Sequence, residues 1–192
     1  MSGGGEKRSG EVIAGADISE EQLKAVERYI EEEAGATNRL SGWLGAAISG
    51  IAVLVSLYHL YAAYGIVPAH ILRPSHVACV LFLAFILFPV SPRFRDRVRW
   101  WDWLGALLSA ATIGYMLAQG ETYGDRAVAP EWWDYAVGVV FIVLLLEATR
   151  RSTGWIMPVV AISFLLYALF GHMLPAPWTH RGYDPERLVG HL

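Results

Sequence analysis

The sequence predicts an all-α integral membrane protein, a polytopic bundle of five transmembrane helices preceded by a short cytoplasmic amphipathic helix. The chain of 192 residues is 55% hydrophobic, with a mean hydropathy of +0.38, above the roughly 45–50% apolar content of soluble domains. Its apolar residues form five blocks close to the roughly 20 residues that cross a bilayer as a helix. The short polar connections leave none of these helices a polar face, and no block alternates as a membrane strand would.

The N-terminal region, residues 1–40, is polar and acidic, and we expect it to be a cytoplasmic tail. After a Gly- and Ser-rich start, Ser19 is a plausible N-cap and Gln22 completes a capping box. Leu23 and Val26 then begin an apolar stripe surrounded by glutamates, which is typical of an amphipathic helix. This helix would rest on the protein or on the membrane surface, or would dock a specific partner.

The five apolar blocks follow in order along the chain. Their expected bounds are Trp43–Val67, Pro74–Val90, Trp101–Ala118, Trp132–Thr149 and Gly154–Leu174. The middle three are short, and flanking aromatic residues would extend them to the interface.

The distribution of basic residues predicts the orientation. With the N-terminus in the cytoplasm, most of the 15 Lys and Arg residues fall on the cytoplasmic side, as the positive-inside rule requires. Five predicted spans then leave the C-terminal segment outside. The tryptophans fall at the two interfaces, as in aromatic belts: Trp43, Trp100, Trp101, Trp103 and Trp155 at the inner one, and Trp132, Trp133 and Trp178 at the outer one.

A charged seam interrupts the apolar sequence at Glu147, Arg150 and Arg151. We interpret it as the cytoplasmic turn between the fourth and fifth helices. Glu147 precedes the two arginines by three and four residues, a favourable order for helical ion pairs, and pairing lowers the cost of a carboxylate at the edge of the hydrocarbon. The alternative is a gating or coupling carboxylate.

Small residues recur at a spacing of four in the third helix and the first. They are Ala106, Ala110, Gly114 and Ala118, and Gly42, Ala46 and Gly50. This spacing lets membrane helices approach closely, although Ala and Gly are also common in such helices for other reasons.

No catalytic, cofactor or metal site is predicted. The histidines form no metal-ligand spacing, and no phosphate-binding or nucleophile motif occurs. His59, inside the first block, would either hydrogen-bond a neighbouring helix or relay a proton. The single cysteine, Cys79, is interpreted as a packing residue. The arginine-rich run between the second and third helices is interpreted as a lipid-headgroup seam rather than a nucleic-acid site.

The C-terminal segment predicts one more helix start, with Asp184 as N-cap and Pro185 at the first position. The sequence stops within three turns of that start, which we interpret as a truncated or split chain.

Three stretches carry a family likeness: "LLLEATRRSTGW", "MPVVAISFLLYALFGHMLP" and "HRGYDPERLVGHL". They resemble the fused permeases of tripartite ATP-independent periplasmic (TRAP) transporters, in the branch whose binding protein is of the TAXI type. "RWWDWLGALLSAA" in the third helix resembles the same branch. In the fused form, a Q-type unit of four helices precedes an M-type unit of about twelve.

The resemblance implies a four-helix Q-type unit over residues 41–149 and the start of an M-type unit over 150–192. It implies a bacterial inner-membrane location and, as partners, the remainder of the M-type unit, a periplasmic solute-binding protein and membrane lipids. The family takes up an organic acid or similar solute with a sodium gradient, and the Q-type unit is scaffold. Because the ligand sites belong to the missing M-type portion, the substrate-binding residues are unknown. The surface near Trp132, Trp133 and Trp178 would be the docking side. One alternative is a stand-alone membrane anchor or assembly protein. Another is a membrane-embedded enzyme, which the lack of catalytic motifs disfavours.

Overall fold

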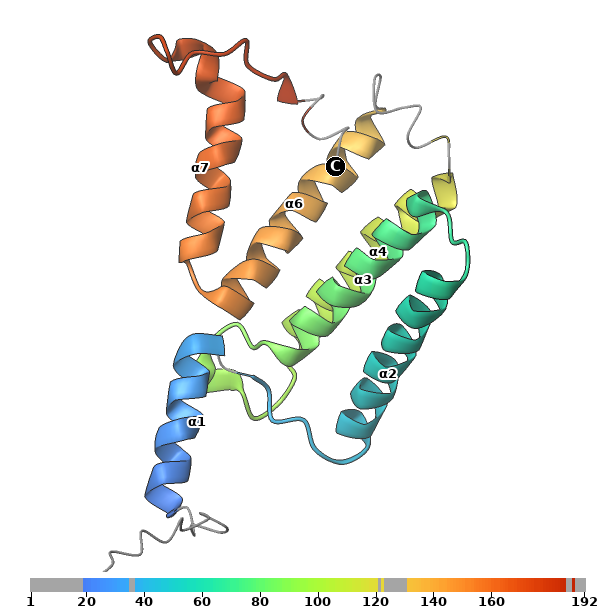
Figure 1. The fold of residues 1–192 in the computed structure, drawn as a ribbon, viewed down its shortest axis with the longest axis vertical. Coiled ribbons are helices and arrows are strands. Elements are labelled where there is room, and N and C mark those ends of the chain that lie inside the picture. Colours follow the sequence, from blue (N-terminus) through green and yellow to red (C-terminus); the bar gives the residue numbers. More distant parts are fainter. Residues whose placement is uncertain (1–18, 35–36, 121, 123–130, 186–187, 189–192) are drawn as a thin grey trace, which may run out of the picture.

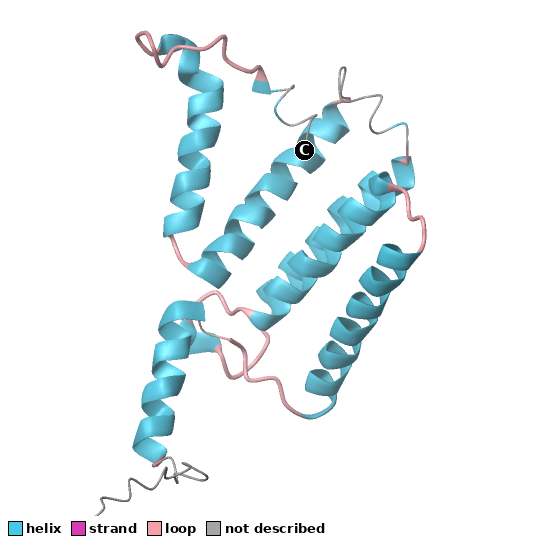
Figure 2. Cartoon of the chain, viewed as in Figure 1, coloured by secondary structure: helices cyan, strands magenta, loops and turns pink. Residues whose placement is uncertain are grey.

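The computed structural model describes residues 19–34, 37–120, 122, 131–185 and 188, and these form helices joined by turns and loops, with no strand among them (Figure 2). The helices are α1 (Glu20–Ala34), α2 (Gly42–Tyr64), α3 (Ala69–Leu87), α4 (Trp100–Gln119), α6 (Trp132–Thr153) and α7 (Ile156–Phe170). Two short 3-10 helices, η1 (Pro92–Phe94) and η3 (Gly171–Met173), lie between or after them.

The long helices run up and down in an antiparallel bundle (Figure 1). α3 and α4 lie at its centre, with α2 on one side and α6 on the other, and α7 stands beyond α6. The C-terminal ends of α3 and α6 and the N-terminal end of α4 lie together, and we call this end of the bundle the charged end. α1 projects from the charged end and contacts α6.

Four described helical segments are long and apolar enough to cross a membrane: Gly42–Tyr64, Ala69–Leu87, Trp132–Thr153 and Ile156–Met173. The sequence prediction counted five. The difference is α4, which is present at the expected place but carries Asp102, Gln119 and three tryptophans near its ends. α4 also packs against both α3 and α6. Its buried face therefore meets protein, and such a face does not need the apolarity of a lipid-facing helix.

The core lies between α3, α4 and α6. Its buried apolar residues are Leu81, Phe85 and Ile86 of α3, Ala106 and Ile113 of α4, Phe141, Leu144 and Ala148 of α6, and Ile48 of α2. By contrast, α2 and α7 expose most of their large apolar side chains, including Leu54, Leu60 and Phe164. Exposed apolar area of this extent marks a surface that another apolar phase covers, as expected of helices in lipid.

Most members of the small-residue stripes are not packed against the described residues. In α4, Ala106 is buried, but Ala110, Gly114 and Ala118 are exposed. The stripe that packs is displaced from the predicted one, and its buried members are Asp102, Gly105, Ala106, Ser109, Thr112 and Ile113. In α2, Gly42, Ala46 and Gly50 are all exposed. The spacing of four therefore does not mark the face of α4 that packs against the described helices, which leaves the general abundance of Ala and Gly as the other explanation.

Two helix boundaries differ from the predicted ones in ways that matter. α3 begins at Ala69, so Pro74 lies inside it instead of near its start. The Ser75 hydroxyl, next to this proline, donates to the carbonyl of Ile71 at 2.7 Å. α6 continues to Thr153 and ends at Gly154, whose φ of +77° suits a glycine. The seam at Glu147–Arg151 is therefore the end of a helix and not a turn, which corrects the interpretation from sequence.

The two ends of the described chain carry the predicted local caps. The Ser19 backbone N–H donates to Gln22 Oε1 at 3.1 Å, and the Gln22 N–H donates to Ser19 Oγ at 3.3 Å. Leu23 and Val26 of α1 are about half exposed, so this apolar stripe is not covered by the bundle. At the other end, the Leu188 N–H donates to the Asp184 carbonyl at 3.0 Å, the first helical hydrogen bond of the predicted helix start.

Candidate functional site

Three helix ends meet at the charged end, and the local sequence determines where each one stops or starts. α3 stops at Leu87, because Phe88 precedes Pro89 and takes an extended conformation. α4 starts at Trp100 and carries Asp102 in its first turn. α6 stops before Gly154. The polar groups left free by these ends are gathered in one place.

Glu147 binds both arginines of the seam. Its Oε2 lies 2.7 Å from Arg150 Nε, and its Oε1 lies 2.8 Å from both Arg150 Nη2 and Arg151 Nε. The carboxylate is therefore held by two guanidinium groups on its own helix, at the spacings of three and four residues noted in the sequence.

Arg151 also reaches across to α4, which the sequence did not reveal. Its Nη1 lies 2.6 Å from Asp102 Oδ1, and the side chains of Arg151 and Asp102 are only 4% and 1% exposed. The other carboxylate oxygen of Asp102 accepts the backbone N–H of Arg99 at 2.9 Å. Burying an ion pair is costly unless the remaining hydrogen-bonding positions are filled, and here they are filled from two chain segments.

The same arginines cap the chain just after the end of α3. Arg151 Nη1 donates to the Phe88 carbonyl at 3.3 Å, and both Nη atoms of Arg150 donate to the Val90 carbonyl at 3.3 Å. Asn38 completes the cap: its Nδ2 and its backbone N–H donate to the carbonyls of Ile86 and Leu87, each at 2.7 Å. Carbonyls that α3 cannot satisfy by itself are therefore satisfied by other segments.

Helix dipoles favour this arrangement of charges. The C-terminal ends of α3 and α6 carry partial negative charge, which favours the guanidinium groups, and the N-terminal end of α4 carries partial positive charge, which favours Asp102. Aromatic rings complete the surroundings: the Arg151 guanidinium lies 4.8 Å from the centroid of the Phe85 ring, and that of Arg150 lies 5.4 Å from Trp155.

Two arginines and two carboxylates make this network formally neutral. We call it the four-charge network, and it consists of Asp102, Glu147, Arg150 and Arg151. Each carboxylate holds at least one guanidinium, so neither is an unpaired carboxylate ready to take a proton or a cation. The network joins α4, α6 and the end of α3, so it acts as a structural clamp that holds these three helices together.

A second polar contact joins the same two helices at the other end of the bundle. Tyr115, near the end of α4, donates from its hydroxyl to Asp134 Oδ1 at 2.8 Å. Asp134 Oδ2 accepts the backbone N–H of Glu131 at 3.0 Å. Asp134 is 4% exposed and occupies the third position of α6, as Asp102 does in α4. The sequence contains the signal: Trp-Trp-Asp opens both helices.

His59 hydrogen-bonds the neighbouring helix. Its Nε2 lies 2.8 Å from His76 Nδ1 on α3, and its Nδ1 lies 2.7 Å from the Val55 carbonyl. The Tyr58 hydroxyl lies 2.9 Å from Ser75 Oγ in the same contact between α2 and α3. Because a carbonyl only accepts, His59 Nδ1 is the donor in its hydrogen bond to Val55. No group of three metal-ligating side chains occurs among the described residues.

The predicted interface tryptophans lie at helix ends. Trp100 opens α4 at the charged end and is 70% exposed, with Trp101 and Trp103 half-buried beside it. Trp132 and Trp133 open α6 at the opposite end and are 65% and 55% exposed.

Cys79, the predicted packing residue, is half-buried in α3.

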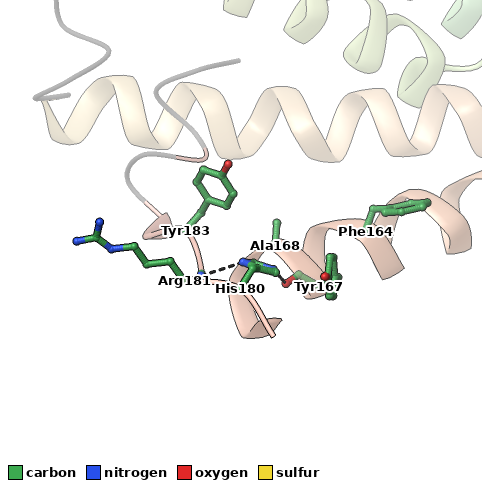
Figure 3. Close-up of a pocket in the computed structure, with 7 residues that line it drawn as sticks. Phe164, Tyr167, Ala168, His180, Arg181 and Tyr183 are labelled. Atoms are coloured by element: carbon green, nitrogen blue, oxygen red, sulfur yellow. Dashed lines mark hydrogen bonds between the residues drawn. The ribbon is translucent and has the colours of Figure 1, made fainter. Parts of the chain in front are cut away.

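The segment after α7 folds back over the end of that helix (Figure 3). His180 Nε2 donates to the Tyr167 carbonyl at 2.8 Å, and His180 Nδ1 accepts the Gly182 N–H at 2.9 Å, which requires a neutral imidazole. An open pocket of about 650 Å³ lies here, lined by Phe164, Tyr167, Ala168, His180, Arg181, Gly182 and Tyr183. Trp178, 67% exposed, belongs to the same segment.

No protein-family model, curated protein or solved structure shows significant similarity to this chain.

Proposed function

We propose that this chain is the scaffold portion of a TRAP-type secondary transporter that takes up an organic acid or similar solute. In this proposal α2, α3, α4 and α6 are the Q-type unit, and α7 is the first helix of the M-type unit. All five cross the inner membrane, with the N-terminus and α1 in the cytoplasm. The resemblance in the stretches from Leu144 to Trp155 and from His180 to Leu192 motivates it.

The observation that carries the scaffold role is the buried Arg151–Asp102 pair at 2.6 Å. A scaffold must hold its helices in one arrangement while another unit moves. The four-charge network ties α4, α6 and the end of α3 together without leaving an unpaired charge. A neutral, fully engaged network favours a static role over that of a gating carboxylate, because gating needs a group that changes partner or protonation state.

The boundary between the two proposed units belongs at Gly154. The sequence placed it between residues 149 and 150, but α6 runs through that point to Thr153. Placing the boundary at Gly154 keeps Arg150 and Arg151 within the Q-type unit, where they bind Asp102, Phe88 and Val90. α7 then begins the M-type unit with little of its surface buried, which suits a helix that packs against further M-type helices.

The outer docking surface remains the side bearing Trp132, Trp133 and Trp178. The α6 tryptophans and the segment after α7 lie at the same end of the bundle, opposite the charged end. The open pocket between Tyr167 and Tyr183 adds an aromatic concavity there. We propose that the periplasmic solute-binding protein contacts this end.

Transport by the completed assembly tests the proposal. The chain is reconstituted in proteoliposomes with an M-type unit encoded beside it and the binding protein, and uptake of labelled organic acids is followed. We expect uptake that needs both an inward sodium gradient and the binding protein. Uptake unchanged when the gradient is collapsed, or when the binding protein is left out, would contradict it.

The second candidate is a stand-alone membrane anchor or assembly protein, and the same clamp would serve it. The coding region downstream separates the two: about eleven more apolar segments, in frame or adjacent, support the transporter. A stable product of 192 residues that copurifies with no permease unit supports the anchor.

A further inference from the structure

The loop between α3 and α4 contains a pocket outside the four-charge network. It has a volume of about 410 Å³ and is lined by Arg93, Phe94, Asp96, Arg97 and Arg99. η1 contributes Arg93 and Phe94, and the residues between η1 and α4 contribute Asp96, Arg97 and Arg99. The pocket lies at the charged end. Along the chain it falls between α3, which is apolar enough to cross a membrane, and the exposed Trp100.

The charges around this pocket are not compensated. Three arginines face one carboxylate, a formal excess of two positive charges. Among the described residues, no ion pair involves Arg93, Arg97 or Arg99. This is the opposite of Arg150 and Arg151, whose charges are matched by Asp102 and Glu147.

One of the three arginines is held in place by aromatic rings. The Arg99 guanidinium lies 4.7 Å from the centroid of the Phe94 ring and 5.2 Å from that of Trp101. Stacking of this kind fixes the direction of the guanidinium without neutralising it, so its N–H groups remain available to an acceptor. Arg93 and Arg97 are exposed and are free to close on a bound anion.

The position of the pocket along the bundle indicates which anion is close enough to bind. Trp100 and Trp101 mark the level at which aromatic side chains meet lipid headgroups. A pocket at that level, with unneutralised guanidinium groups, faces the phosphates of the adjacent leaflet. Guanidinium forks bind phosphate oxygens in pairs, and each basic residue strengthens binding to an anionic surface.

We propose that this pocket binds the phosphate of an anionic phospholipid headgroup, with Arg93, Arg97 and Arg99 as donors and Asp96 limiting the net charge of the site. Free phosphate has the same chemistry, but the pocket's place at the membrane surface favours the lipid. This proposal does not rest on the transporter assignment, since it needs only that the bundle be embedded in a bilayer.

Lipid titration followed by native mass spectrometry tests it. The full chain, stripped of lipid in detergent, is titrated with phosphatidylglycerol or with phosphatidylcholine of the same acyl chains. We expect phosphatidylglycerol to bind at least about tenfold more tightly, because its headgroup carries net charge. In R93Q/R97Q we expect its affinity to fall about 25-fold, from about fivefold per arginine, with phosphatidylcholine unaffected.

Arg73 provides the matched control. It is exposed, lies near the opposite end of α3, and has no ion pair among the described residues. R73Q should change phosphatidylglycerol affinity less than about twofold, against about fivefold for R97Q. D96N should raise the affinity severalfold, which keeps the test decisive if the double variant does not fold.

Three results would overturn the proposal. They are equal binding of the two lipids, an equal effect of R73Q and R97Q, or D96N leaving phosphatidylglycerol affinity unchanged. Displacement of phosphatidylglycerol by millimolar inorganic phosphate would show a site for a free anion instead of a lipid.

Discussion

Arg151 is the residue on which the charged end depends most. One guanidinium contacts two carboxylates, a carbonyl at the end of α3 and the Phe85 ring. Its side chain is 4% exposed, and water cannot take over these interactions when the arginine is removed. Arg150 makes similar bonds but is 18% exposed, and its partner Glu147 is 32% exposed, so solvent screens that pair more strongly.

The first prediction compares these two arginines. R151Q should lower the free energy of unfolding by about 3–5 kcal/mol, because it leaves the buried Asp102 without its counter-charge. R150Q should cost about 1 kcal/mol or less. Unfolding in mixed micelles with increasing denaturing detergent, followed by circular dichroism, measures both. D102N combined with R151Q should recover part of the loss, and equal effects of R150Q and R151Q would refute the assigned roles.

At the scale of elements, α4 and α6 are joined at both ends by the same device. Each helix begins with Trp-Trp-Asp, and each buried aspartate accepts the backbone N–H of the residue just before its helix, Arg99 or Glu131. The remaining oxygen accepts a donor from the other helix: Arg151 of α6 for Asp102, and Tyr115 of α4 for Asp134. Because the helices are antiparallel, the first turn of each meets the last turns of the other.

The second prediction concerns the far contact. Y115F should destabilise the protein by about 1.5 kcal/mol, the loss of a hydrogen bond to a charged acceptor. Combined with R151Q, the effects should add within about 0.5 kcal/mol, since the two contacts lie at opposite ends of the bundle and share no partner among the described residues. Strong coupling in this double-mutant cycle would contradict two independent contacts.

The third prediction tests the packing of α3 against α4. A Cβ added at Gly105 would lie 2.5 Å from the Phe85 ring, whereas one added at Gly114 would have nothing within 4 Å. G105A should therefore cost about 1–3 kcal/mol through overcrowding. G114A should be neutral or stabilising by up to about 1 kcal/mol, because alanine is the better helix former. The same detergent unfolding curves report both, and G105A behaving like G114A would sink the packing model.

At the scale of the whole molecule, the number of crossings decides which sides the two ends of the chain face. Four of the described helical segments are long and apolar enough to cross a membrane. α4 lies among them with a similar length and runs antiparallel to α3 and α6. If α4 also crosses, five crossings put residues before α2 and after α7 on opposite sides of the membrane; if it does not, they lie on the same side.

The fourth prediction concerns the sides of the membrane that the two ends face. Because Cys79 is the single cysteine, one substitution gives a background without thiols. In a C79A background, T37C and T179C place one thiol before α2 and one after α7, and both threonines are exposed. In intact cells, an impermeant thiol reagent should label T179C and not T37C, and T37C should react only after the membrane is opened. Labelling of both thiols in intact cells would reject five crossings and the proposed scaffold topology together.

The sequence by itself determined the features that depend on near neighbours along the chain. Long apolar blocks must form helices in lipid, because backbone polar groups have no other partners there. The Ser19–Gln22 cap and the Glu147 pairs with Arg150 and Arg151 follow from spacings of three and four residues.

Only the tertiary structure decided which face of α4 is buried and that Asp102 is the partner of Arg151, 49 residues away. The physical reason is that a membrane helix is apolar on every face, so the spacing of its apolar residues does not mark the side that packs. The choice falls instead to close contacts such as Gly105 against Phe85, and to buried charges that must find each other across helices.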